Sequence, residues 1–480
     1  MRWRFDVLLL TASCVLSIAY LVLRYSGRNG LATPLVAASV FALAAMAVYA
    51  LCSTTDRRRG LIAWRLVGIV CTVPCLILFC EALSRHIWRG LVCLESLDSL
   101  RPPYLCWDSA GRTRVVPDTF PLENFHRGGD ETAHLAAAMA MRKSWGMPSG
   151  ISEMVGEPQG HDRSYWLRRA LTGHPPGLAM IYAPVAENPP LARVWAGLVF
   201  LACIAAAFWA GNQWSPETRF GLLAAATFAS IPNLDWWHAV SVSSDIPPCF
   251  FCFLAFGLLA RATKPNGYDV KEDAPIRLAG LVLGVGCLVT LTASLASLAA
   301  AMLVGVIGGR RRIGHALWLV IPSVLCVVAG MAYSKLAVPV SQHPVLARLD
   351  LAPISGVRTF TGPLVGLLTF VRRWPMDLGI PLTLLFALLP VRQMIRLGDP
   401  QSRRWVLGGL LAAGAVLVPS AIMFWPEIRF AFPGFLGVLL GLGFLDYWKE
   451  LSPRLRAATV ATIVAFAYSK FVLHNLLVVG

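Results

Sequence analysis

Residues 313–333 read IGHALWLVIPSVLCVVAGMAY, a run of apolar and small side chains with one histidine and no Asp, Glu, Lys or Arg. About 20 such residues form an α-helix long enough to cross the hydrocarbon core of a bilayer. Similar runs recur from one end of the 480-residue chain to the other. The sequence therefore predicts an all-α polytopic membrane protein with about thirteen transmembrane helices.

One long polar loop, residues 84–190, interrupts this pattern after the third expected span. The short apolar stretch 174–185 inside it is bounded by proline pairs, which favours a surface or re-entrant helix over a crossing. The expected spans are residues 5–23, 31–52, 61–83, 191–210, 220–231, 246–259, 278–290, 295–307, 313–333, 377–395, 406–424, 430–445 and 457–477.

The composition agrees with a membrane protein, because 56% of the residues are hydrophobic and 14% are charged, against about 25% charged in soluble domains. The net charge of +16 comes from short Arg and Lys clusters such as Arg57–Arg59 and Arg310–Arg312. These clusters follow even-numbered spans, as the positive-inside rule predicts, so nucleic acid is not an expected partner. The same rule places the N-terminus inside and the long loop outside.

Most of the twelve cysteines lie in apolar runs, where they behave as small hydrophobic residues. Cys249 and Cys252 have the spacing of a redox or metal motif, but we expect them in a hydrocarbon-facing helix without other ligands. Cys93 and Cys106 lie in the long loop, where they could form a disulfide if the loop is outside the cytosol.

The long loop contains the stretch His126–His134, HRGGDETAH. Asp130 and Glu131 follow two glycines and precede an alanine-rich run. Carboxylates at a helix N-terminus are favourable for the helix dipole alone. The functional interpretation is a general base, aided or not by a metal ion. We also predict two amphipathic interfacial helices in the loop, over residues 131–145 and 163–170.

Two further segments carry charge on the expected outer side. Asp245 opens the sixth span, on the same expected side of the membrane as Asp130 and Glu131. Ser244 or Asp245 could cap the helix ahead of Pro247, and this structural role is compatible with a functional one. Arg429 lies in a very short loop, where its guanidinium suits a lipid phosphate, although an ion pair with Glu427 is the simpler alternative.

Four segments together resemble motifs of GT-C glycosyltransferases, in particular the protein O-mannosyltransferase and lipid A aminoarabinose transferase group. Gly129–His134 is similar to the group's first-loop acidic motif, and His174–Gly177 to its His/Lys-Pro-Pro-Leu motif. Asp245 with the helix after it, and Glu427–Pro433, resemble two later motifs. Gly177 stands where the group usually has Leu, and Ser244 departs from the usual residues before the aspartate.

The resemblance implies a GT-C-like catalytic core over residues 61–445, two extra N-terminal helices over 1–60 and a C-terminal helix over 446–480. It implies transfer of one sugar from a polyprenyl-phosphate donor to a hydroxyl of a lipid, glycan or protein acceptor, with inversion. The implied base is Asp130; Glu131 would support it or hold a divalent metal, and no cofactor is certain. The other implied site residues are Asp245, Arg429 on the donor phosphate, and the substrate-loop residues His134, His174, Pro175 and Pro176.

A second function from another class stays open, because a transporter or flippase of lipid-linked glycans would also be polytopic. The sequence contains no internal repeat and few charges in the middle of a span, which favours the enzyme. An inactive scaffold that keeps the fold is a third possibility. The expected location is the inner (plasma) membrane, with the active site on the extracytoplasmic side.

Overall fold

The computed structural model describes residues 128–155, 170–171, 174–230, 242–263, 273–307 and 311–338, with ten further residues between 407 and 460. This described part is helical and contains no strand, which confirms the expected all-α fold for it. Several expected spans, among them 5–23, 31–52, 61–83 and 377–395, lie outside it.

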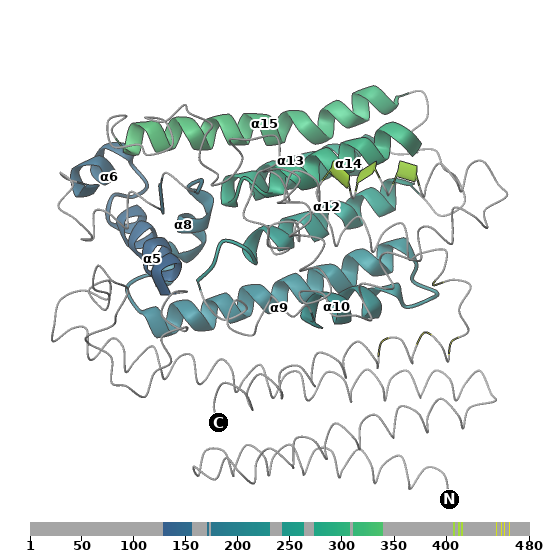
Figure 1. Cartoon of the computed structure of the whole chain (residues 1–480), viewed down its shortest axis with the longest axis horizontal. Helices are drawn as coiled ribbons and strands as arrows, with labels where there is room; N and C mark the ends of the chain where they lie inside the picture. Colours follow the sequence, from purple (N-terminus) through teal and green to yellow (C-terminus); the bar gives the residue numbers. More distant parts are fainter. Residues whose placement is uncertain are drawn as a thin grey trace, which may run out of the picture.

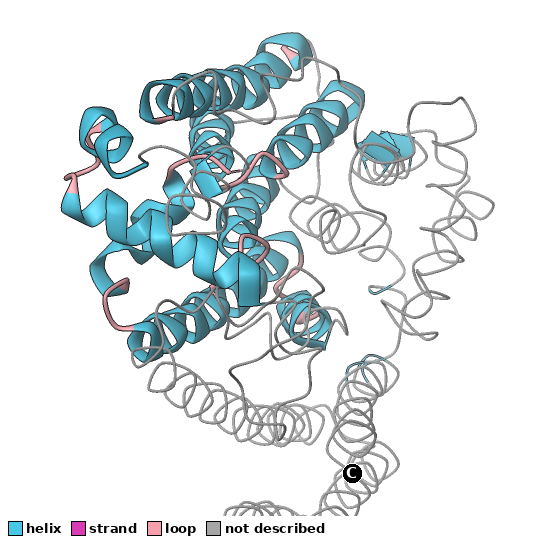
Figure 2. Ribbon diagram, turned by 60° about the vertical axis from the view of Figure 1, so that its left-hand side comes forward, coloured by secondary structure: helices cyan, strands magenta, loops and turns pink. Residues whose placement is uncertain are grey.

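The described helices form a bundle whose long members run in alternating directions (Figures 1 and 2). The bundle consists of α9 (Pro189–Trp214), α10 (Phe220–Ser230), α12 (Pro247–Thr263), α13 (Asp273–Val289), α14 (Ala293–Ile307) and α15 (Arg312–Ala337). Four further elements cover one end of it: α5 (Gly128–Lys143), α6 (Pro148–Val155), α8 (Gly177–Tyr182) and the 3-10 turn η2 (Ala183–Val185). We call these four elements the cap and this end the cap end.

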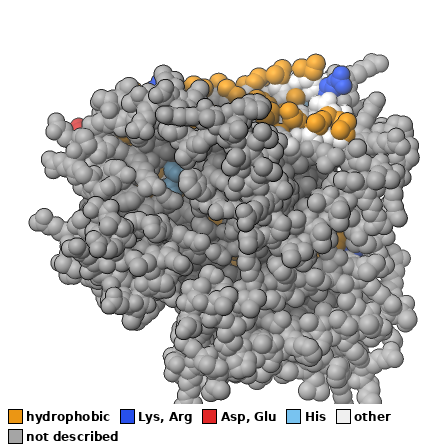
Figure 3. Space-filling view, viewed as in Figure 1, with side chains coloured by type: hydrophobic (Ala, Val, Ile, Leu, Met, Phe, Trp, Pro, Cys, Tyr) orange, Lys and Arg blue, Asp and Glu red, His pale blue; other side chains and the backbone are white. Residues whose placement is uncertain are grey.

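Two of the bundle helices are long and apolar enough to cross a membrane, the part of α9 from Leu191 to Trp214 and the whole of α15. Only 22% of an 18-residue apolar stretch of α15 is buried inside the structure. Its exposed side chains recur every three or four residues, as at Ile313, Leu317 and Ile321, and they gather in an apolar patch (Figure 3). An exposed apolar face of this length suits lipid rather than water. The structure thus supports a helical membrane protein.

The segment 174–185 contains only the six residues of α8 and the three of η2 in helical form. At about 1.5–2 Å of rise per residue this is far below the thickness of a bilayer core. The following helix α9 begins independently: the Asn188 side chain accepts a hydrogen bond from the Leu191 amide at 3.1 Å, with Pro189 and Pro190 in the first turn. The interpretation of residues 174–185 as a non-crossing segment therefore agrees with the structure.

Helices α13 and α15 pack closely because glycine recurs where they meet. A Cβ atom on Gly280 would overlap the carbonyl oxygen of Trp318, and one on Gly284 would lie 3.1 Å from the Pro322 carbonyl oxygen. Pro322 has no amide hydrogen, so the Trp318 carbonyl lacks its usual helical donor. Small residues spaced four apart are a common contact between membrane helices.

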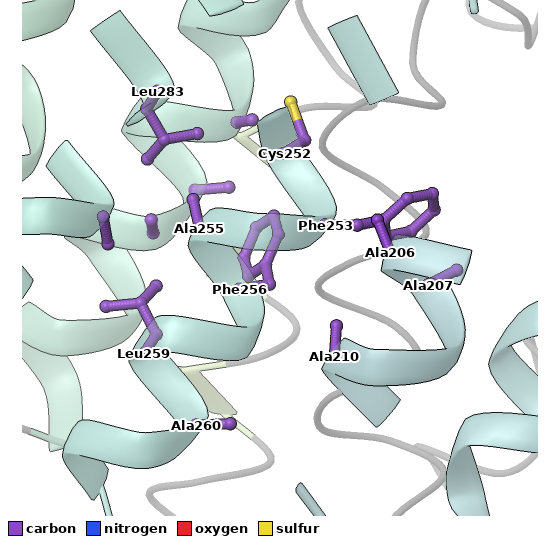
Figure 4. Packing of buried hydrophobic residues seen from close by; sticks show 14 of the residues in the cluster. Ala206, Ala207, Ala210, Cys252, Phe253, Ala255, Phe256, Leu259, Ala260 and Leu283 are labelled. Atoms are coloured by element: carbon purple, nitrogen blue, oxygen red, sulfur yellow. The ribbon is translucent and has the colours of Figure 1, made fainter. Parts of the chain in front are cut away.

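The centre of the bundle joins α9, α12 and α13. Small residues of α9, including Ala206 and Ala207, lie beside Phe253 of α12, and Phe256 belongs to the same buried cluster (Figure 4). Cys249 and Cys252 are fully buried in this core with Cys203 and Cys287, so our expectation that they face hydrocarbon is wrong. Hydropathy does not distinguish a lipid-facing side chain from one packed on a neighbouring helix. No metal-binding cluster occurs among the described residues.

The opposite end of the bundle, which we call the basic end, contains a charged network. Asp273, the first residue of α13, contacts Arg311 Nη1 at 2.9 Å and His315 Nε2 at 2.8 Å. Arg277, one turn along α13, lies 3.9 Å from the same carboxylate. The hydrogen bond with His315 and the neighbouring positive charges lower the pKa of Asp273 below its ordinary value. The network ties the start of α13 to the start of α15.

Candidate functional site

The acidic motif lies at the beginning of α5, which starts at Gly128. Asp130 and Glu131 therefore occupy the first turn, where the helix dipole favours negative charge, as the sequence predicts. Their side chains lie outside the described part of the structure. The histidine that closes the motif, His134, is four residues after Asp130 and thus on the same helix face. Its side chain is described and is buried.

Helix α5 differs from the expected amphipathic interfacial helix, because every residue from Ala133 to Ala138 is buried. One face packs on α6, and Met141 also contacts the Tyr333 hydroxyl of α15; Ala137 and Met141 belong to one buried cluster with Ile151. The other face packs on α8 and η2, and its Leu135 belongs to one buried cluster with Leu178 of α8. The small alanine side chains allow neighbours to approach from both sides, so α5 lies packed between the other elements of the cap. The second predicted amphipathic helix, residues 163–170, lies almost wholly outside the described residues.

The first two predicted motifs meet through a pair of histidines. The rings of His134 and His174 are in edge-to-face contact, with centroids 4.7 Å apart and planes at 75°. His174 is positioned by its backbone amide, which donates to the Ala170 carbonyl at 2.9 Å. Two imidazoles in contact can share hydrogen bonds and exchange protons with a bound polar ligand. This contact was not predicted from the sequence, although both residues were.

The segment after His174 is clamped between two bundle helices. A Cβ atom on Gly177 would lie 2.5 Å from the carbonyl oxygen of Leu288 in α13. On the other side, a Cβ atom on Gly330 of α15 would lie 3.3 Å from Pro175. Glycine at position 177 therefore has a steric reason in this chain, since no side chain fits between α8 and the end of α13. This close approach is a physical reason for glycine at position 177, where the motif that the segment resembles has leucine.

The third predicted residue, Asp245, lies just before α12 at the same end of the bundle. Its side chain is buried, with 8% exposed, and Pro247 and Pro248 open the helix after it, as expected. Nearby Val242 packs in one cluster with Leu135 of α5 and Leu178 of α8. The segment that carries Asp245 thus packs on the same part of the cap that holds the histidine pair.

The structure therefore brings together, at the cap end, the start of α5, the His174–Gly177 segment and the segment that carries Asp245. Arg429 and the whole fourth motif lie outside the described residues, as do Cys93 and Cys106. The divalent metal that the resemblance allows stays a prediction that depends on Asp130 and Glu131.

Sequence reasoning assigned no role to the polar turn between α13 and α14. Thr292 Oγ1 donates to Thr290 Oγ1 at 3.3 Å, and Ser294 Oγ donates to the Leu291 carbonyl at 2.6 Å. The preceding Val289 belongs to the cluster that joins α5 and α8, so this turn adjoins the candidate site. Its only signal in the sequence was three hydroxyl residues between apolar runs, which is also the ordinary pattern of a helix connection.

Comparison of the chain with protein-family models, with curated proteins and with solved structures finds no match.

Proposed function

We propose that the chain is an inverting membrane glycosyltransferase, which moves one sugar from a polyprenyl-phosphate donor to an acceptor hydroxyl. The observation that carries this proposal is the convergence of three motif segments, far apart in the sequence, at the cap end of an apolar helix bundle. A donor with its polyprenyl chain in lipid and its sugar at the membrane surface suits a site at the end of such a bundle. The acceptor is a lipid, glycan or protein hydroxyl.

In this proposal Asp130 is the general base. It takes the proton of the acceptor hydroxyl while that oxygen attacks the anomeric carbon, and the bond from that carbon to the phosphate oxygen breaks. The electron pair leaves with polyprenyl phosphate, and the attack from the opposite side inverts the anomeric centre. Alignment of the two reactants and removal of one proton supply much of the rate, because the phosphate is a good leaving group.

The other site residues have supporting roles in the proposal. Glu131 supports the base or holds a divalent metal, and Asp245 shapes the pocket from the α12 side. His134 and His174 orient the sugar or the loop, with Pro175 and Pro176 keeping that loop rigid. Arg429 binds the phosphate, and a guanidinium there would stabilise the charge that develops as the donor departs.

The test is a donor-turnover assay on purified full-length protein in nanodiscs, with a panel of polyprenyl-phosphate sugars and release of polyprenyl phosphate as the readout. Wild type is compared with Asp130→Asn and with Glu153→Gln, a matched control because Glu153 is an exposed carboxylate on the neighbouring helix α6. We expect turnover of one donor by wild type and the control, and its loss in Asp130→Asn. Equal turnover in all three proteins would contradict the assignment of Asp130.

The same proteins distinguish the enzyme from a transporter or flippase. A flippase would move a labelled polyprenyl-phosphate sugar between leaflets without cleaving it, and Asp130→Asn would keep most of this movement. Lipid movement without release of polyprenyl phosphate would therefore overturn the proposed transfer reaction.

A further inference from the structure

The turn between α5 and α6 exposes large apolar side chains. Trp145 is 93% exposed and Met147 is 62% exposed, and Met154 of α6 adds to the same region of the cap. The alanines just before the turn are buried, so the exposure begins abruptly where α5 ends. A tryptophan in this position has an apolar ring and one polar N–H group, which is the combination enriched where membrane meets water.

This exposure is built into the backbone of the turn. Trp145 has a φ of 52° and Gly146 a φ of 73°, both in the left-handed region. The Gly146 amide donates to the Met141 carbonyl at 2.8 Å, and Ser144 Oγ donates to the Ala140 carbonyl at 2.7 Å. The chain leaves α5 through a closed helix-ending turn, and a bulky residue in a left-handed conformation is uncommon. These hydrogen bonds fix the backbone of the turn that presents Trp145.

The turn is also attached to the candidate membrane span α15, near the C-terminal end of that helix. The hydroxyl of Tyr333 in α15 donates to the Gly146 carbonyl at 3.0 Å and contacts Met141 Sδ at 3.3 Å. Leu336, in the last turn of α15, is 69% exposed and ends the apolar stripe of that helix. Trp145 is thus the neighbour of Gly146, which is hydrogen-bonded to Tyr333 about one turn before the C-terminal end of α15. This is the level at which a span leaves the hydrocarbon core.

Positive charges accompany these side chains. Lys143 precedes the turn and Lys335 lies in the last turn of α15, and both are exposed. Arg142 is partly neutralised by Glu187, whose carboxylate lies 3.5 Å away, and Glu153 on α6 is exposed as well. Exposed lysines beside an exposed tryptophan are typical of a surface that meets lipid phosphates above and acyl chains below.

We propose that the α5–α6 turn is a membrane-interface anchor, with Trp145 and Met147 inserted at the headgroup level of the leaflet at the cap end. The partner is the lipid surface itself. The anchor would hold the cap against the bilayer, so that the first turn of α5 stays near the headgroups. This inference rests on the membrane location of the bundle and not on sugar transfer.

The test uses the protein in nanodiscs with all sixteen tryptophans replaced by 5-fluorotryptophan. The fluorine signal that disappears in Trp145→Phe belongs to Trp145. Broadening of this signal is then compared between a nitroxide on the upper acyl chain of added lipid and a water-soluble gadolinium chelate. Trp318, 43% exposed on the candidate span α15 and assigned through Trp318→Phe, is the matched control for contact with lipid.

We expect the lipid nitroxide to broaden the Trp145 signal more strongly than the aqueous chelate does, as for Trp318. A Trp145 signal broadened mainly by the chelate, while Trp318 responds to the lipid, would overturn the anchor. A second measurement is thermal unfolding of Trp145→Ala. A Tm lowered in nanodiscs but unchanged in detergent supports the anchor, whereas equal Tm values for variant and wild type in nanodiscs contradict it. Neither measurement depends on turnover of a donor.

Discussion

At the basic end of the bundle the acidic group Asp273 is matched by Arg311 and His315, whereas at the cap end His134 and Asp245 are buried among converging segments. The first arrangement joins two helices through opposite charges. The second gathers imidazole and carboxylate groups beside the first turn of α5 and beside a polar turn. Charges that pair with each other are typical of structural support, and polar groups gathered where several segments meet are typical of a site. Substitutions at the two ends should therefore affect different measurements.

The largest expected difference concerns Asp130. We predict that Asp130→Asn lowers turnover by about 10²-fold or more, because the acceptor proton loses its base. Its Tm should stay near that of wild type, since the carboxylate is replaced by a group of the same shape. The assay is release of polyprenyl phosphate, with thermal unfolding on the same preparation. If Asp130→Asn turned over the donor at nearly the wild-type rate, Asp130 would not be the base, and the cap end would no longer differ from the basic end in its effect on activity.

The next effect tests the clamp on the substrate loop. Gly177→Ala places a methyl group 2.5 Å from the Leu288 carbonyl oxygen, so α8 must move away from α13. We expect a loss of about 1–3 kcal/mol in unfolding free energy, the usual result of overpacking. The matched control is Gly305→Ala in α14, where no atom lies within 4 Å of the added Cβ. Equal Tm values for the two variants would mean that α8 and α13 do not approach each other closely at Gly177.

A smaller effect is expected at the fourth motif. Arg429→Ala should raise the KM for the donor by about 10-fold, which is the size of one lost charge-assisted hydrogen bond, with less change in kcat. Arg429→Lys should restore part of the affinity through its charge. Steady-state kinetics over a range of donor concentrations measures both parameters. A donor KM that does not change in Arg429→Ala would place the phosphate elsewhere, with Arg358, Arg372 and Arg373 as the next candidates.

The smallest effect belongs to the basic end. Asp273→Asn should lower the Tm by a few degrees at most, because exposed ion pairs contribute little, and it should leave turnover intact. The pKa of Asp273 is lower in the folded protein than in the unfolded chain. Its contribution to stability is therefore complete above the ordinary aspartate pKa of about 3.9 and is lost as pH falls through the folded pKa. The Tm difference between wild type and variant should close on acidification. A constant difference would show that charge is not its cause.

Much of the helical framework can be predicted from the sequence, because a long hydrophobic run in a helical membrane protein forms a helix over nearly its whole length. The described helices α9, α14 and α15 lie within a few residues of the expected spans. Helix α13 begins five residues before the expected 278, since a search for apolar residues excludes Asp273 and Arg277. Those charges are tolerated because they belong to the network with Arg311 and His315.

The candidate site was predicted in part. His134, His174 and Asp245 were chosen from local motifs, but their convergence depends on how α5, α8 and α12 pack. The sequence also did not predict that Cys249 and Cys252 are buried, or that α5 is packed on two faces. An apolar or alanine-rich helix has the same sequence pattern whether lipid or another helix covers a given face.

Long apolar helices with charges at their ends can be predicted from the sequence of this chain, because chain length, hydropathy and proline positions act locally. Which helix faces meet depends on the packed structure: the steric need for Gly177 and Gly280, the histidine pair and the outward Trp145. The glycine contacts and the histidine pair depend on atoms from segments distant in the sequence, and the turn that carries Trp145 is attached to α15 by the Tyr333 hydroxyl. Their contact is determined by close packing, which no single segment encodes.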